Sequence, residues 1–81
     1  MALFTTPDLA LDVFLDDRLS KPSAMENHSG MMLFARPDTA QLRKAVSEYF
    51  NGGQVNALRF AQAMRRKKAE MLTVKKMAEK V

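Results

Sequence analysis

The sequence has 81 residues, 47% of them hydrophobic, with one histidine and no cysteine, which predicts one domain (1–81) and excludes a disulfide framework or a thiolate metal site. No apolar run approaches the roughly 20 residues of a membrane-spanning helix, so we expect no membrane partner and a cytoplasmic or virion-associated protein. The net charge of +4 is uneven, because residues 1–30 carry five acids and two bases whereas residues 54–81 carry eight bases and two acids.

The first predicted element is a helix over residues 7–20, "PDLALDVFLDDRLS", which begins with a proline suited to the first helical position. Its residues are mostly apolar, apart from an acidic strip of Asp8, Asp12 and Asp16 spaced four apart. Residues at this spacing lie on one face of a helix. The strip is either a solvent-facing edge or a surface that faces basic side chains, and the sequence leaves both interpretations open.

A loop or linker is predicted over residues 21–30, where Pro, Ser, Asn and Gly occur without periodicity. It contains His28, which we interpret as a surface residue. The apolar run "MMLFAR" at 31–36 follows. We expect extended chain there, either filling the helical core or pairing as a strand with another molecule, because we identify no partner strand within the chain.

Two further helical regions are predicted in the C-terminal half. Residues 38–50 place apolar side chains at helical spacing, and the "NGG" that follows can end a helix and reverse the chain. Residues 54–81 allow two interpretations, either helices at 54–71 and 73–81 or one long helix. The predicted fold class is therefore all-α, with three or four helices and a short extended segment.

Apolar side chains on these segments are the candidates for a partner or homodimer interface. Several recur at the alternating three-and-four spacing of a heptad seam along 54–81, which is typical of helix pairing, and Lys67 is the one position that breaks this seam. The candidate interface residues are Met31, Leu33, Phe34, Phe60, Met64, Met71 and Val74.

Residues 60–81 resemble the first two helices of the helix-turn-helix domain in phage repressor and Cro-type regulators. The residues that carry the resemblance are Leu72 and Thr73 at the turn, and Met77 and Ala78 as the apolar–alanine pair of the second helix. The order of a strand, a helix, a glycine-containing turn and a helix over 31–70 is also similar to that of the ribbon-helix-helix repressors. These resemblances imply a DNA-binding regulator of transcription that acts as a dimer.

The chemistry of the side chains favours binding over catalysis, because we find no cysteine and the lone histidine lies in a polar loop. We therefore expect no enzyme activity, no metal, no cofactor and no small-molecule substrate. The basic side chains of the C-terminal region are instead candidates for phosphate contacts with DNA or RNA. They are Arg59, Arg65, Arg66, Lys67, Lys68, Lys75, Lys76 and Lys80.

Two functional hypotheses follow from these features. The first is a small basic DNA-binding or regulatory factor of phage or plasmid type, held mainly by phosphate contacts from the C-terminal helix. The second is a protein-binding module, such as a virion or assembly component or a small inhibitor of a host complex, whose helices clasp a partner.

Overall fold

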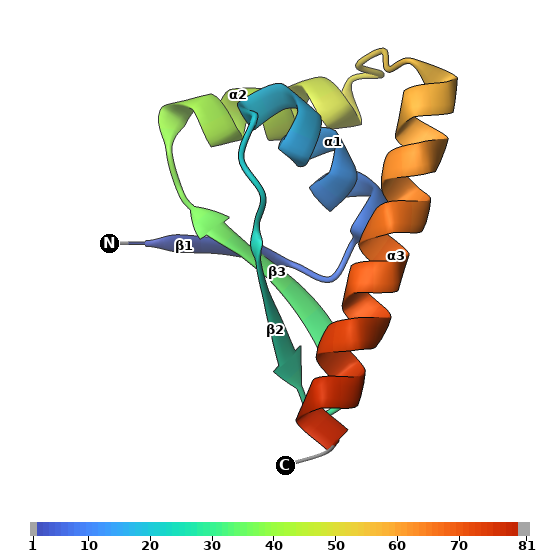
Figure 1. Ribbon diagram of the computed structural model, residues 1–81. Coiled ribbons are helices and arrows are strands. Elements are labelled where there is room, and N and C mark those ends of the chain that lie inside the picture. Colours follow the sequence, from blue (N-terminus) through green and yellow to red (C-terminus); the bar gives the residue numbers. More distant parts are fainter. Residues whose placement is uncertain (1, 80–81) are drawn as a thin grey trace.

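The computed structural model describes residues 2–79, which form a three-stranded antiparallel sheet and three helices (Figure 1). The elements in chain order are β1 (Leu3–Thr6), α1 (Leu9–Leu19), β2 (Ala24–His28), β3 (Met31–Pro37), α2 (Ala40–Phe50) and α3 (Ala57–Glu79). The all-α prediction is therefore wrong. Its three main helical regions are present, but the sheet was not predicted.

Strand β3 lies at the centre of the sheet, in the order β1–β3–β2. It contains the run for which we expected either unpaired extended chain or a partner in another molecule, yet both its partners belong to the same chain. Strand β2 falls within the predicted loop. It pairs with β3 through a two-residue turn at Ser29 and Gly30, which both have positive φ angles (55° and 88°). Such a turn matches the twist of an antiparallel pair.

The sheet has one face turned to the helices and one open face. Phe34 pairs with Thr6 on one side and with Met25 on the other, so these three side chains lie in one row. Phe34 and Thr6 are buried and Met25 is half-buried, which identifies their face as the covered one, because successive residues of a strand point to opposite faces. On the opposite face, Leu3 and Met31 are largely exposed.

Local hydrogen bonds determine where the first two helices begin. Asp8 precedes α1, and its carboxylate accepts a hydrogen bond from the Leu11 amide at 3.2 Å. Thr39 precedes α2, and its hydroxyl accepts one from the Leu42 amide at 3.1 Å. Both contacts satisfy backbone donors that have no partner within the helix.

The last helix is continuous. α3 runs without interruption from Ala57 through Leu72 and Thr73 to Glu79. The interpretation as one long helix is therefore confirmed over these residues. The Thr73 hydroxyl donates to the Ala69 carbonyl at 3.1 Å, one turn earlier in the same helix. Thr73 therefore lies inside α3 and does not cap a second helix; residues 80–81 lie outside the described part of the chain.

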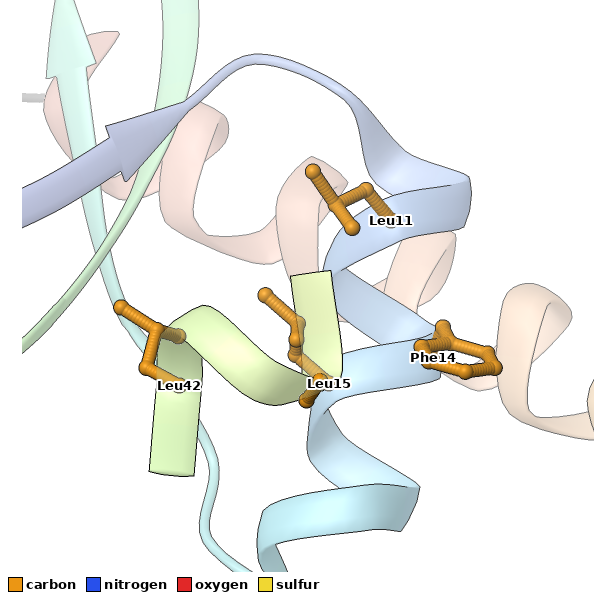
Figure 2. Close-up of a cluster of buried hydrophobic side chains, with 5 residues drawn as sticks. Leu11, Phe14, Leu15 and Leu42 are labelled. Carbon is orange, nitrogen blue, oxygen red and sulfur yellow. The ribbon is translucent and has the colours of Figure 1, made fainter. Parts of the chain in front are cut away.

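The hydrophobic core lies between α1 and α2. It consists of the buried side chains Leu11, Phe14, Leu15, Leu42 and Ala45. Figure 2 shows how Phe14 and Leu15 of α1 lie relative to Leu42 of α2. Phe60 of α3 packs against the rim of this core, so the start of α3 is fixed by apolar contact.

Helix α3 then runs along one edge of the molecule, past α1 and towards the far end of β2 (Figure 1). The described chain is flat, with extents of 39 × 34 × 18 Å along its principal axes. Among the described helices, α3 included, none is both long enough and apolar enough to cross a membrane.

Candidate functional site

A cluster of four charged side chains joins α1, β3 and the middle of α3. Asp12 and Asp16 come from α1, Arg36 from β3 and Lys67 from α3, and we call them the buried ion cluster. Asp12 is 0% exposed and Lys67 is 6% exposed. Two carboxylates and two cations balance in charge, which is the condition under which ionised groups can remain buried.

Each charge in the buried ion cluster has at least two partners. The Lys67 Nζ lies 2.6 Å from an Asp16 oxygen and 3.1 Å from an Asp12 oxygen. Arg36 donates to the other Asp12 oxygen at 2.7 Å and also to Asp16. Arg36 further donates to the backbone carbonyls of Lys21 and Asp12, at 2.7 and 2.9 Å. The cluster therefore ties three elements and the loop after α1 together.

The protonation of Lys67 reflects two opposing effects. Burial by itself would lower the pKa of its ammonium group, because desolvation disfavours the charged form. The hydrogen bonds to Asp16 and Asp12, together with the charges of these carboxylates, outweigh burial and raise the pKa of Lys67 above its usual value. Lys67 is therefore held as a cation inside the protein.

This cluster answers the question left open by the acidic strip. Asp12 and Asp16 face basic side chains within their own molecule, whereas Asp8 caps α1. The sequence contained a signal for the contact, since the two aspartates break the apolar pattern of one helix and Lys67 breaks the apolar seam of another. Arg36 within an apolar strand is the third such exception. No local pattern shows that these particular residues are partners.

Lys67 is consequently removed from the candidate phosphate ligands, because its buried ammonium group is already paired with carboxylates. Arg59 is mostly exposed but lies 3.2 Å from an Asp17 oxygen. Arg66 is exposed and lines an open groove of about 480 Å³ between α1 and α3, which also contains Asp17 and Glu70. Lys80 lies outside the described residues.

The remaining four candidates form one exposed surface on α3. Because a helix turns by about 100° per residue, the four side chains lie within an arc of roughly 100° around the helix axis. The nearest end of this arc is about 80° away from Lys67. All four side chains are exposed, and none is within ion-pair distance of a carboxylate among the described side chains. We call this surface the cationic flank; it consists of Arg65, Lys68, Lys75 and Lys76.

Most of the predicted interface residues pack inside the molecule. Phe34 is fully buried. On α3 the half-buried side chains share the side of the helix that carries Lys67, and α3 contacts α1 and β2. The heptad seam is thus the surface by which α3 docks onto its own chain. Its predicted members on α3 are Phe60, Met64, Met71 and Val74.

Two of the predicted interface residues remain accessible on the open face of the sheet. Met31 is largely exposed and Leu33 is half-buried. His28, which lies on the same face, has its ring 3.0 Å from the carboxylate of Glu26 and is exposed. Within the described residues no three histidine, aspartate or glutamate side chains are placed to hold a metal ion.

Comparison with known proteins gives no match to a family model, to a curated protein or to a solved structure.

Proposed function

We propose that the protein binds nucleic acid through the cationic flank of α3, by contacts with phosphate groups. The observation that carries the proposal is a contrast among the basic residues of α3. Lys67 and Arg59 pair with aspartates of α1, whereas the four cations of the flank project from one side of a regular helix without a carboxylate partner among the described side chains. Such a surface supplies the electrostatic attraction that dominates nucleic-acid affinity.

The flank is also held in a fixed orientation. Phe60 fixes the start of α3 against the core, and Lys67 fixes its middle through two carboxylates. A cation on an ordered helix loses less conformational freedom on binding than a cation on a flexible tail. The buried ion cluster therefore serves the proposed function indirectly, by presenting the flank on a rigid element.

The proposed role is that of a small DNA-binding or regulatory factor of phage or plasmid type, without enzyme activity. It places the protein in the cytoplasm or in a virion, where nucleic acid is available to it. The alternative, a module whose acidic helix clasps a partner, has less support because Asp12 and Asp16 are engaged internally. A homodimer or protein partner stays a prediction, and the apolar surface left for it is the open face of the sheet around Leu3 and Met31.

The test compares two variants of equal net charge. In the first, Arg65, Lys68, Lys75 and Lys76 are replaced by alanine; in the control, Lys21, Arg43, Lys44 and Arg66 are replaced. All eight side chains are exposed. Binding to a labelled duplex and to a labelled single strand is measured by fluorescence anisotropy at about 50 mM salt, and circular dichroism verifies folding.

We expect the flank variant to lose binding by at least about 100-fold, because four phosphate contacts are removed, and the control to lose much less. Equal losses in the two variants would show that net charge alone, and not the flank, attracts the nucleic acid. Absence of binding by the wild-type protein to every nucleic acid would contradict the proposal itself.

A further inference from the structure

The cationic flank has a regular geometry along α3. A helix rises about 1.5 Å and turns about 100° per residue. Arg65 and Lys76 therefore project within roughly 20° of each other, and so do Lys68 and Lys75. The four cations therefore form two rows, Arg65 with Lys76 and Lys68 with Lys75, which are about 80° apart around the helix.

Two rows of cations on one side of a helix match the cross-section of one groove of duplex DNA, where a helix lying along the groove has a phosphate strand on each side. The major groove of B-form DNA is about 12 Å wide, is bordered by phosphates on both sides and admits an α-helix. With α3 lying along the groove, Arg65 and Lys76 can reach the phosphates of one strand while Lys68 and Lys75 reach those of the opposite strand. The major groove of an A-form RNA helix is deep and narrow and cannot be entered in this way.

The position of α3 in the fold allows such an approach. Figure 1 shows α3 along one edge of the molecule, with the sheet and the other helices to one side of it. The described chain is only 18 Å thick along its shortest axis. A helix at the edge of a flat molecule can enter a groove without the rest of the protein meeting the DNA backbone.

An apolar side chain lies at the centre of the flank. Leu72 falls between Lys68 and Lys75 along the axis and, by rotation, between the two rows, near the middle of the arc that the four cations span. The Leu72 side chain is 59% exposed. Its apolar surface therefore stays in contact with water, and covering this surface on binding would be favourable in free energy. The apolar group that a major groove offers to such a side chain is the C5-methyl group of thymine, which uracil lacks.

We infer that the nucleic acid bound by this protein is B-form duplex DNA, with α3 in the major groove, a pair of cations on each phosphate strand and Leu72 against a thymine methyl group. The inference rests on the proposed function. It deepens that function by naming the duplex, the groove and the base atom.

The experiment measures the affinity of the full chain for three duplexes of equal length by fluorescence anisotropy. They are alternating adenine–thymine DNA, the same DNA with uracil in place of thymine, and double-stranded RNA. Each is titrated with the wild-type protein, with Leu72→Ala, and with Leu58→Ala as the matched control. Leu58 is an exposed leucine of the same helix, about 10 Å beyond the flank.

We expect the wild-type protein to bind the thymine duplex about threefold to fivefold more tightly than the uracil duplex, the change typical of one buried methyl group. Leu72→Ala abolishes this preference and Leu58→Ala retains it. RNA binds at least about tenfold more weakly than DNA. Equal affinity for the thymine and uracil duplexes, or equal affinity for RNA, would overturn the inference and leave the proposed function standing. Absence of binding to all three duplexes and to a single strand would instead contradict the proposed function.

Discussion

At the scale of single residues, Lys67 joins the middle of α3 to α1. It is the only buried residue of α3 among those whose side chains are described. Its two carboxylate partners belong to the first helix of the chain, far away in sequence. A buried ion pair of this kind contributes little net stability against an apolar replacement of the whole group, but loss of one member leaves an unbalanced charge.

We therefore predict that Lys67→Met destabilises the protein by about 3–5 kcal/mol, because Asp12 and Asp16 would then share one cation, Arg36. Lys68→Met is the matched control, since Lys68 is the exposed neighbour, and should change stability by less than about 0.5 kcal/mol. Urea unfolding followed by circular dichroism measures both values. A cost for Lys67→Met as small as that of the control would show that the buried ion cluster does not hold α3.

The same residue predicts a loss of stability at alkaline pH. The pKa of Lys67 is raised in the folded protein, so the folded state binds this proton more tightly than the unfolded chain does. The stabilisation is complete below the unfolded pKa of about 10.4 and is lost as the pH rises through the higher folded value. Unfolding at pH 9 and at pH 11 should show a larger drop for the wild-type protein than for Lys67→Met. Equal drops would assign the effect to other groups.

At the scale of the elements, the connection between α2 and α3 depends on two glycines with different requirements. Gly52 has a φ of 81°, which favours glycine, and a side chain there would meet open space. Gly53 lacks a positive φ, but a Cβ atom there would lie 2.9 Å from both the Glu48 carbonyl oxygen and the Phe14 ring. Backbone conformation restricts which residues can replace Gly52, whereas packing restricts which residues can replace Gly53.

We expect Gly52→Asn to be tolerated within about 1 kcal/mol, because asparagine adopts the left-handed conformation more readily than other side chains. Gly53→Ala should cost more, since a backbone oxygen and a core ring must both move. Thermal unfolding of the two variants compares them. The packing of Gly53 against Phe14 would be contradicted if Gly53→Ala were the milder of the two changes.

The elements also show what the sequence could and could not predict. The helical regions were predicted because each has apolar side chains at helical spacing. Strands β1 and β2 were missed because four- and five-residue segments carry little periodicity, and β2 (Ala24–His28) contains polar residues typical of a loop. The pairing of α1 with α3 through Asp12, Asp16 and Lys67 depends on contacts between residues about 50 positions apart, which no local pattern specifies.

At the scale of the whole molecule, the charges of the buried ion cluster balance one another inside the fold, whereas the cations of the flank lie on the surface. The carboxylates of α1 balance Arg36 and Lys67 inside the fold, so the acidic N-terminal region does not neutralise the flank. The candidate binding residues could be identified from the sequence as a set of eight. Their reduction to the four of the cationic flank required the three-dimensional arrangement, because consecutive cations on a helix point in different directions.

The dependence of binding on salt tests the central claim most directly, because the number of counterions released on binding is proportional to the number of phosphate contacts. The affinity of the wild-type protein for duplex DNA, plotted as log K against log salt, should have a slope of roughly −3 to −4, as expected for about four phosphate contacts. The variant with alanine at Arg65, Lys68, Lys75 and Lys76 should show a slope near zero. An equally steep slope in this variant, or no measurable binding by the wild-type protein at low salt, would contradict the account.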